Sequence, residues 1–299
     1  MDEINIKDIK LLVIVITFNG DKWIEKCINS ILNSIVNSKI FIVDNGSTDE
    51  TINLIENHPS FNQFIFIKSK ENLGFGKANN LGFKYAIENN FDYIYLLNQD
   101  AWVYPDTYKK LIEIHRLKNK AGILSPLQIS STLNSFDTGF SYYCPAEMVS
   151  DFFFHHIKLE YKCEFVNAAH WLISRECLEI VGGFNPNFQM YGEDNNYCER
   201  AINKGFDILI VTNTMGVHDR KFRKENDEKK IYFRYIKGMR ILNSPIIKKK
   251  FLNLSLFYFE VFLRYKNKKD FKNFVFLISN YFKIKKIFLQ SLQQMAFLK

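Results

Sequence analysis

The stretch Leu11–Gly20, LLVIVITFNG, decides the fold class of this chain of 299 residues. Its first six residues are apolar and mostly β-branched, which is typical of a strand that is buried on both faces. Apolar residues then recur at helical spacing from about residue 21 to 36, which predicts an amphipathic helix. A buried strand that leads directly into such a helix is the first half of a β-α-β unit.

The same alternation continues along the chain. Further buried strands are expected at 40–43, 64–67 and 93–97, with helices between them. Ser47 and Glu50 match a capping box that would open the second helix. The pattern predicts an α/β fold with a Rossmann-like, mostly parallel central sheet that is flanked by helices.

Polar residues follow the carboxyl end of each predicted strand. Ligands of open α/β sheets bind beyond these ends, so we expect a binding site there. The residues in question are Thr17-Phe18-Asn19, Asp44-Asn45, Asn72-Leu73-Gly74 and Asn98-Gln99-Asp100. Their shared position is the first indication of a function.

The second half of the chain is less regular, and residues 121–162 show no clear pattern. After them the sequence predicts a strand, two helices, and a second strand that precedes a loop with His218. The expected ranges are 165–174 for the first strand, 175–181 and 194–204 for the helices, and 208–211 for the second strand.

The net charge changes sign along the chain. Residues 1–219 contain 19 Lys and Arg but 27 Asp and Glu, whereas residues 220–299 contain 21 basic and 5 acidic residues. We therefore predict an α/β domain at 1–219 and a basic, amphipathic helical segment at 220–299. Its interleaved Lys, Arg, Phe and Tyr favour an anionic membrane surface as partner. A helical cover for the sheet and a homodimer surface are alternatives, and nucleic acid is disfavoured because no recognition motif accompanies the charge.

Cysteine usage and the N-terminus bear on location. The five cysteines are scattered and form no C-x-x-C pair, which favours a reducing compartment over a disulfide framework. The charged start MDEINIKDIK does not resemble a secretory signal, and no stretch reaches the ~18 apolar residues of a membrane span. We expect a cytoplasmic protein that binds peripherally to the inner face of the cell membrane.

Several acidic residues and one histidine are candidates for chemistry, each with a structural alternative. Asp44 is suited to accept the N3–H of a uracil or thymine ring, or is a turn aspartate. Asp100 is suited to hold a divalent cation against a diphosphate, or is a turn residue. Asp194 in Glu193-Asp194 either takes a proton from an attacking hydroxyl or interacts with a helix dipole. His218 is a metal ligand or a plain surface histidine.

Two further groups are harder to assign. His170 and Trp171 either line an acceptor cleft or pack in the core. The basic run Arg220-Lys221-Phe222-Arg223-Lys224 either closes over a diphosphate as a cationic lid or forms a solvated loop.

Taken in order, six motifs resemble those of the family 2 inverting glycosyltransferases with the GT-A fold, and most of all the rhamnosyltransferase-like members. Each motif alone is weak, but the ordered set is specific, and it covers about residues 9–220. The motifs are Val15 to Asn19 (VITFN), Val43 to Asp49 (VDNGSTD), Asn72 to Asn80 (NLGFGKANN), Leu96 to Asp100 (LLNQD), Gly182 to Asp194 (GGFNPNFQMYGED) and His218.

The resemblance implies a role for each site residue, with residues 1–219 as a GT-A type, nucleotide-sugar-binding catalytic domain. Asp100 and His218 would hold Mg²⁺ or Mn²⁺, Asp194 would be the catalytic base, and Glu193 would support the acceptor side. The implied donor-binding residues are Thr17, Asn19, Asp44, Asn45, Lys77, Asn80, Asn98, Gln99 and Asp100.

The resemblance also implies a reaction. A dTDP- or UDP-linked sugar, rhamnose or a hexose, would be transferred with inversion to a hydroxyl of a saccharide or lipid-linked saccharide, in cell-surface polysaccharide biosynthesis. Asn98 replaces the first acid of the family's D-x-D motif, so one carboxylate carries most of the metal binding. A catalytically weak module that binds nucleotide-sugar or lipid is the alternative. A sugar nucleotidyltransferase is disfavoured, because residues 13–20 lack a phosphate loop rich in glycine and arginine.

Overall fold

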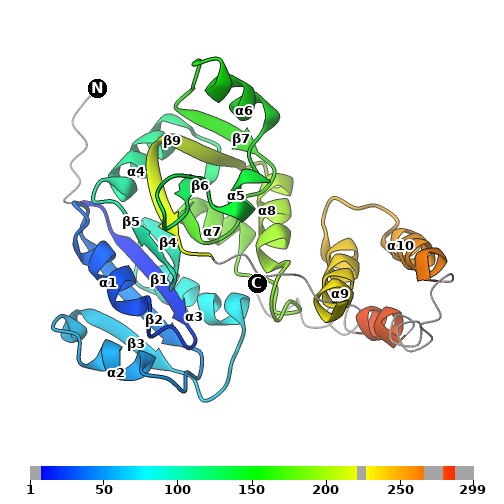
Figure 1. The fold of residues 1–299 in the computed structure, drawn as a ribbon, viewed down its shortest axis with the longest axis horizontal. Coiled ribbons are helices and arrows are strands. Elements are labelled where there is room, and N and C mark those ends of the chain that lie inside the picture. Colours follow the sequence, from blue (N-terminus) through cyan, green and yellow to red (C-terminus); the bar gives the residue numbers. More distant parts are fainter. Residues whose placement is uncertain (1–7, 221–226, 266–278, 287–299) are drawn as a thin grey trace.

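The computed structural model describes residues 8–220, 227–265 and 279–286 of the chain. These residues form one nine-stranded sheet with helices on both faces, and a group of C-terminal helices that lies to one side (Figure 1). The strands are β1 (Leu11–Thr17), β2 (Ser38–Asp44), β3 (Phe64–Lys68), β4 (Tyr93–Asn98), β5 (Ala101–Val103), β6 (Ala121–Ile129), β7 (Glu160–Cys163), β8 (His170–Ser174) and β9 (Asp207–His218). The helices are α1 (Ile24–Leu32), α2 (Thr51–Glu56), α3 (Phe75–Glu88), α4 (Thr107–Leu117), α5 (Thr138–Ser141), α6 (Ala146–Phe153), α7 (Arg175–Val181), α8 (Glu193–Asn203), α9 (Asp227–Asn243) and α10 (Lys250–Tyr265).

The sheet is mixed, with one parallel half. Its strand order is β3-β2-β1-β4-β8-β6-β9-β5, and β7 also pairs with β9. The β3-β2-β1-β4 half is parallel, as the β-α-β pattern predicts. Beyond β4, β8 is antiparallel to both β4 and β6, and β9 is parallel to β6 but antiparallel to β5 and β7. The predicted Rossmann-like α/β class is confirmed, while the later strands make the sheet less parallel than expected.

Alternate residues of β1 point to opposite sides of the sheet and begin two separate cores. Leu12 and Ile14 pack with residues of α3, α7 and α8 on one side, whereas Leu11, Val13 and Val15 pack with α1 and α4 on the other. These five side chains are at most 1% exposed. Burial on both faces explains why LLVIVI contains no polar position.

Some elements differ from their predicted form. The capping box does not form, because the Ser47 hydroxyl accepts from the Asn19 N–H at 2.9 Å and α2 begins only at Thr51. The stretch expected to be irregular contains β6, which is buried along its whole length. Pro126, in the middle of β6, hides this strand in the sequence. It lies at a register shift of the β6–β9 pairing, where a missing N–H is tolerated.

Strands β8 and β9 also have other bounds than predicted. β8 begins at His170, so residues 165–169 of the predicted strand form a loop. β9 continues from the predicted 208–211 to His218. His218 therefore lies at the end of a strand, which fixes its backbone more firmly than a loop would.

The C-terminal helices pack around a small core of their own. It consists of Phe188, Met239, Leu242, Leu254 and Ile284, all at most 1% exposed. Phe188 comes from the loop before α8, so this core also includes part of the α/β domain. Within the described residues, no helix is both long enough and apolar enough to cross a membrane. The predicted boundary at 219/220 falls one residue after the end of β9, and residues 221–224 of the basic run lie outside the described residues.

Candidate functional site

Side chains from β1, β2 and the turn after β4 meet at one edge of the sheet. The end of β1 at Thr17 pairs with the end of β2 at Asp44. Gln99 accepts from the Thr17 hydroxyl at 2.7 Å and from the Phe18 N–H at 2.8 Å, and it donates to the Phe18 carbonyl at 3.1 Å. Both halves of the Gln99 amide are therefore used to fix the end of β1.

Asn19 links this strand end to the loop after β2. Its backbone is left-handed (φ 48°), a conformation that Asn tolerates better than most residues. Its N–H donates to the Ser47 hydroxyl at 2.9 Å, and its Oδ1 accepts from the Thr48 N–H at 2.9 Å. Asn19 thus holds together two of the loops that the sequence assigns to the donor.

Asp44 has an unused carboxylate oxygen at the same edge. Its Oδ2 accepts from the N–H groups of Gly46 at 3.1 Å and Ser47 at 3.0 Å, and the side chain is 0% exposed. Its Oδ1 is buried without a hydrogen-bond partner. Leaving a buried acceptor unpaired costs on the order of 1–3 kcal/mol, so this atom is suited to a ligand that brings its own donor.

Three other predicted donor-binding residues have different surroundings. Asn45 accepts from and donates to the backbone of residues 73–74, at 3.1 and 3.4 Å. Asn80 does the same with the N–H and carbonyl of Phe184, at 2.7 and 2.9 Å. Both amides therefore hold neighbouring loops in place, and Lys77 is exposed on the first turn of α3. Their contact with a donor stays a prediction.

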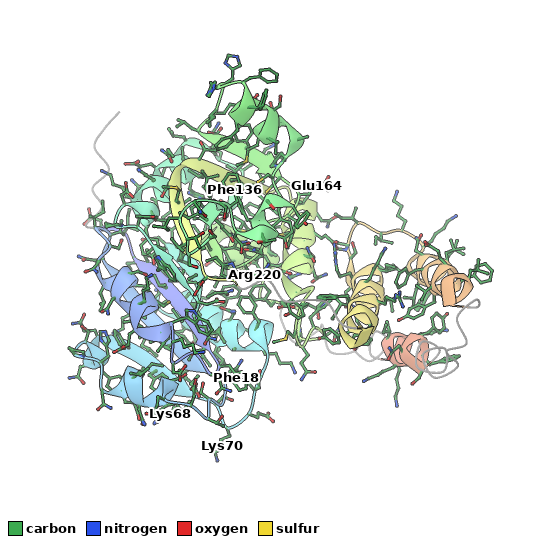
Figure 2. The ribbon with its side chains drawn as sticks, viewed as in Figure 1. Phe18, Lys68, Lys70, Phe136, Glu164 and Arg220 are labelled. Carbon is green, nitrogen blue, oxygen red and sulfur yellow. The ribbon has the colours of Figure 1, made fainter. Side chains whose placement is uncertain are left out.

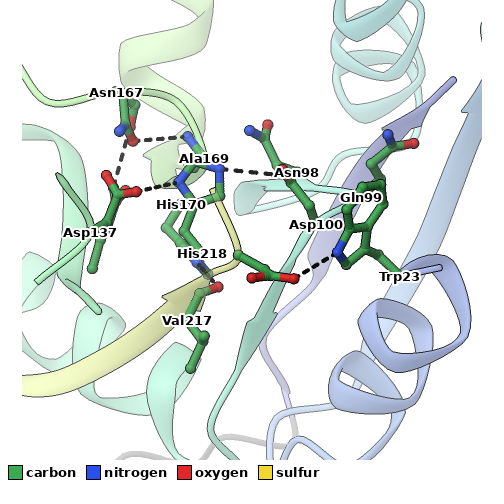
Figure 3. A network of polar contacts seen from close by, with 12 residues as sticks. Trp23, Asn98, Gln99, Asp100, Asp137, Asn167, Ala169, His170, Val217 and His218 are labelled. Carbon is green, nitrogen blue, oxygen red and sulfur yellow. Dashed lines mark hydrogen bonds and ion pairs between the residues drawn. The ribbon is translucent and has the colours of Figure 1, made fainter. Parts of the chain in front are cut away.

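The β5–β9 pairing brings the two predicted metal ligands together. Ala101 pairs with His218, which places Asp100 next to the histidine (Figure 3). Asp100 Oδ1 and His218 Nε2 are 3.5 Å apart. Burial raises the pKa of Asp100, but the hydrogen bond and the charge of His218 outweigh burial and hold this pKa below its ordinary value. Asp100 is therefore a carboxylate at neutral pH.

A second carboxylate, Asp137, lies behind His218. Its Oδ2 is 3.5 Å from His218 Nδ1, and both side chains are at most 2% exposed. Its Oδ1 accepts from the Phe140 N–H at 2.8 Å and caps α5. A metal-bound histidine commonly directs its second nitrogen at a carboxylate, which fixes the ring. Asp137 takes this position, although the sequence analysis did not identify it.

The Asp100–His218 pair fits a divalent cation. Adjacent ligands at ~2.1 Å from an octahedral Mg²⁺ lie ~3 Å from each other. The observed 3.5 Å is close to this spacing and stands at the long limit for a hydrogen bond. Among the described residues, no group of three or more His, Cys, Asp or Glu side chains is arranged to hold a metal ion. Magnesium sites in proteins often use one or two protein ligands and take the others from substrate phosphates and water.

Asp219 forms hydrogen bonds to three segments of the chain next to this pair. Its carboxylate accepts from the Trp23 indole N–H at 2.8 Å and from the Ser131 hydroxyl, and its N–H donates to the Asp100 carbonyl at 2.8 Å. It therefore positions Asp100 and His218. The sequence analysis missed this residue, because its partners are far apart in the chain.

The assignment of His170 and Trp171 to an acceptor cleft is wrong. Both side chains are 0% exposed. His170 lies 2.9 Å from the Tyr95 hydroxyl and 3.0 Å from the Val217 carbonyl, and burial lowers its pKa to about 3, so the ring is neutral. The Trp171 indole donates to the Val166 carbonyl at 3.2 Å. The alternative, core packing, holds for both, and His170 supports the strand that carries His218.

Glu193 and Asp194 begin α8, directly after the left-handed Gly192 (φ 87°). Glu193 is 5% exposed, and its Oε2 has no hydrogen-bond partner. Burial and, to a lesser extent, the charge of Asp194 raise the pKa of Glu193 to about 8. Burial also raises the pKa of Asp194, against the opposing effects of a backbone N–H and of Arg240. A carboxylate with a raised pKa is a stronger proton acceptor, as a general base must be.

Arg220 connects the metal pair with the carboxylates of α8. It lies two residues after the end of β9 (Figure 2). Its charge adds to the lowered pKa of Asp100 and opposes the effect of burial on Asp194. Burial raises the pKa of Tyr143. The charge of Arg220 acts against this rise, and the charge of Asp194 adds to it. The guanidinium also lies against Gly139, so a side chain added there would displace it. The charge of Arg220 therefore acts on both Asp100 and Asp194, which is consistent with one shared site.

Residues 12–182 match the family model of glycosyl transferase family 2. This range is more than half of the chain. The chain belongs to glycosyl transferase family 2. It is therefore a glycosyltransferase, and the family and enzyme class predicted from the sequence are confirmed. The rhamnosyltransferase-like subtype stays a prediction.

Two curated relatives of this family 2 glycosyltransferase illustrate its range. Glycosyltransferase GlyA of Streptococcus pneumoniae is 30% identical over 111 residues, which are 36% of this chain and 16% of that protein. Poly-beta-1,6-N-acetyl-D-glucosamine synthase of Staphylococcus aureus is 29% identical over 141 residues, 42% of this chain and 34% of that protein. The chain thus corresponds to well under half of either relative.

Solved structures of similar fold cover more of the chain. TarS residues 1–349 of S. aureus have a TM-score of 0.59 at 16% identity, with 92% of this chain and 81% of that chain covered. The same TarS fragment has also been solved in complex with UDP-GlcNAc. GalNAc-T7 with UDP, GalNAc and Mn²⁺ has a TM-score of 0.59 at 14% identity, covering 79% and 52% of the two chains. At these identities the similarity establishes the GT-A fold alone.

In this glycosyltransferase the C-terminal helices hold the loop that leads to α8. Asn243, at the end of α9, accepts with Oδ1 from the side-chain amides of Asn185 at 3.0 Å and Asn187 at 3.1 Å. Its backbone carbonyl accepts from the Asn196 amide at 3.0 Å. Phe188, from the same loop, is buried in the C-terminal core. The position of Glu193-Asp194 therefore depends on α9 as well as on the sheet.

Proposed function

We propose that this glycosyltransferase moves a sugar from a pyrimidine nucleoside-diphosphate sugar to an acceptor hydroxyl and inverts the anomeric carbon. The observation that carries the proposal is the Asp100–His218 pair, with Oδ1 and Nε2 3.5 Å apart. The charge of Arg220, which acts on both Asp100 and Asp194, supports placing the proposed base in the same site. The unpaired Oδ1 of Asp44 supports a uridine or deoxythymidine donor, because both bases present an imide N–H that it would accept.

Asp100 and His218 would hold Mg²⁺ or Mn²⁺. Such a cation neutralises negative charge that develops on a diphosphate leaving group. The Mn²⁺ in the GalNAc-T7 structure supports this assignment, since both proteins have the same fold. Asp137 keeps the His218 ring oriented. Arg220 is suited to pair with the same phosphates, because a guanidinium binds phosphate oxygens with two parallel hydrogen bonds.

Asp194 would act as the general base. It takes the proton of the acceptor hydroxyl as the hydroxyl oxygen attacks the anomeric carbon, and the bond to the nucleoside diphosphate breaks with its electron pair on the leaving oxygen. One displacement of this kind inverts the configuration. With its pKa of about 8, Glu193 is mostly protonated at neutral pH, so it adds little negative charge beside the base.

The donor sugar and the acceptor are proposed from similar proteins and from the sequence motifs. TarS was solved with UDP-GlcNAc, which favours a UDP-linked sugar, while the motifs favour dTDP-rhamnose. The name of the S. aureus synthase supports a role in polysaccharide biosynthesis. A saccharide or lipid-linked saccharide would be the acceptor, reached from the inner face of the membrane through residues 220–299.

A thermal-shift screen with UDP-, dTDP- and GDP-sugars tests the donor class, with Mn²⁺ and with a chelator. A pyrimidine donor should raise the melting temperature in the presence of Mn²⁺, since it binds only the folded chain. Asp194→Asn should keep this shift and lose transfer. A shift with GDP-sugars alone would refute the pyrimidine assignment, and near-full transfer by the variant would remove Asp194 from the role of base.

A further inference from the structure

The outward face of α10 carries a stripe of large apolar side chains. Its members are Leu252, Leu256, Phe259 and Leu263, which are 53, 55, 58 and 49% exposed. Their spacing of four, three and four residues places them along one line of the helix. Soluble monomers rarely leave a continuous apolar surface of this kind in water unless it binds something.

The stripe does not contribute to the packing of α10 within the chain. The opposite face of this helix carries Leu254 and Val261, which are 0 and 6% exposed. Leu254 packs with Met239 of α9 and with Ile284 in the C-terminal core. α10 is therefore apolar on two faces, of which one is already buried.

Exposed lysines occur just before α10 and in the segment that packs on it. Lys248 and Lys249, just before α10, are exposed, as is Lys286 in the short segment that packs on this helix. Phe282 in the same segment is 63% exposed. Over residues 220–299 the chain has 21 basic and 5 acidic residues. A partner that is both apolar and negatively charged would match the stripe and the charge of this segment.

An anionic lipid surface meets both requirements. Its acyl chains accept the apolar side chains, and its headgroups attract the lysines, by about 1 kcal/mol for each Lys or Arg close to the membrane. A second copy of the chain would bring another strongly basic surface against the first. A nucleic acid would leave the leucines unmatched.

We propose that α10 lies in the plane of an anionic membrane, with Leu252, Leu256, Phe259 and Leu263 inserted between the headgroups. α10 packs on α9, and α9 holds the loop before the carboxylates of α8. Membrane binding would thus keep the catalytic site at a fixed distance from the bilayer. The lipid contact stands by itself, and only its use for a lipid-linked acceptor rests on the proposed function.

Flotation of the full chain with lipid vesicles tests the contact. We expect binding to vesicles that contain phosphatidylglycerol, weaker binding at high salt, and little binding to pure phosphatidylcholine. Leu256→Glu combined with Phe259→Glu should lower the vesicle-bound fraction by at least about tenfold. Burial of each apolar side chain in the membrane strengthens binding by about that factor, and both substitutions remove it. Leu117→Glu, at a 62% exposed leucine on α4, is the matched control and should bind like the wild type.

Absence of wild-type binding to both vesicle types would overturn the proposal, as would undiminished binding of the double variant. Light scattering measures the oligomeric state of the wild type and of the double variant. If the wild type is a dimer and the double substitution dissociates it, the stripe binds a second copy instead of lipid. The thermal shift that a donor causes without lipid measures donor binding separately from membrane binding. A double variant that retains its donor shift but no longer floats supports the membrane contact. If the wild type floats but shows no donor shift, only the proposed function fails.

Discussion

Replacing Asp137 by Asn removes a single negative charge next to the proposed metal ligand His218. The carboxylate oxygen Oδ2 is 3.5 Å from His218 Nδ1, and Oδ1 caps α5 through the Phe140 N–H. Asn has the same size and is an equally good helix cap. The substitution therefore removes the charge behind the imidazole and keeps the local fold.

The size of the effect follows from distance and burial. Both side chains are at most 2% exposed, so water screens them little. Two unit charges at this separation interact by roughly 5 kcal/mol at an effective dielectric of ~20. A metal-bound imidazole carries only part of a unit charge, and the Asn amide keeps a dipole. We therefore expect a smaller loss, ~1.4–2.7 kcal/mol, which is a ~10–100-fold weaker affinity for the metal.

A titration of sugar transfer with Mn²⁺ measures this loss. The midpoint of activation should move to ~10–100-fold higher Mn²⁺, while the rate at saturating Mn²⁺ stays within a few-fold of wild type. The melting temperature without metal should hardly change. Asp106→Asn, at the exposed partner of Lys110 (2.6 Å), is the matched control. A variant midpoint within about twofold of wild type would refute the reasoning, because it lies outside the range for such a carboxylate.

Three further substitutions test other parts of the site. Glu193 has a pKa raised from 4.5 to about 8, so the folded chain keeps a proton that the unfolded chain releases, and stability falls as the pH rises through this window. Glu193→Gln should flatten that fall, measured by melting at pH 5 and pH 8. Asn243→Ala removes the acceptor for Asn185 and Asn187 and should cost ~1–3 kcal/mol of stability and lower kcat, whereas Asn243→Asp should retain most of the rate. Arg220→Ala should raise the donor KM by roughly tenfold, since a guanidinium makes charge-assisted bonds to phosphate, and it should lower the melting temperature without ligand, because Arg220 opposes the effect of burial on Asp100 and Asp194; an unchanged KM would separate Arg220 from the donor.

The parallel half of the fold was predictable because its information is local. LLVIVI is apolar at every position, and burial on both faces requires this. The polar residues after each strand lie at one edge, because parallel strands all end on the same side of the sheet. The antiparallel half was not predictable in the same way. β5 has only three residues, and β6 contains a proline, so neither gives a clear period.

The site was predictable where a motif marks it, and not where only tertiary structure brings residues together. Asp100 and His218 stand in recognisable motifs, and the β5–β9 pairing unites them. Asp137 lies in a stretch without a clear pattern, and its proximity to His218 arises only from the folded sheet. His170 and Trp171 are predicted to belong to the site, although they are buried in the core. A histidine or tryptophan in a strand does not reveal from the sequence whether it faces the core or a cleft.

The charge boundary after residue 219 describes the surface of the molecule better than its core. The sign of the charge changes there, but packing continues across it. The loop from Gly182 to Gly192 is held on one side by Asn80, through Phe184, and on the other by Asn243, with Phe188 buried among the C-terminal helices. Part of the packing that places α8 thus comes from beyond the boundary. The surface that we propose to face lipid and the residues that hold the loop before the proposed catalytic carboxylates are therefore two faces of the same helical layer.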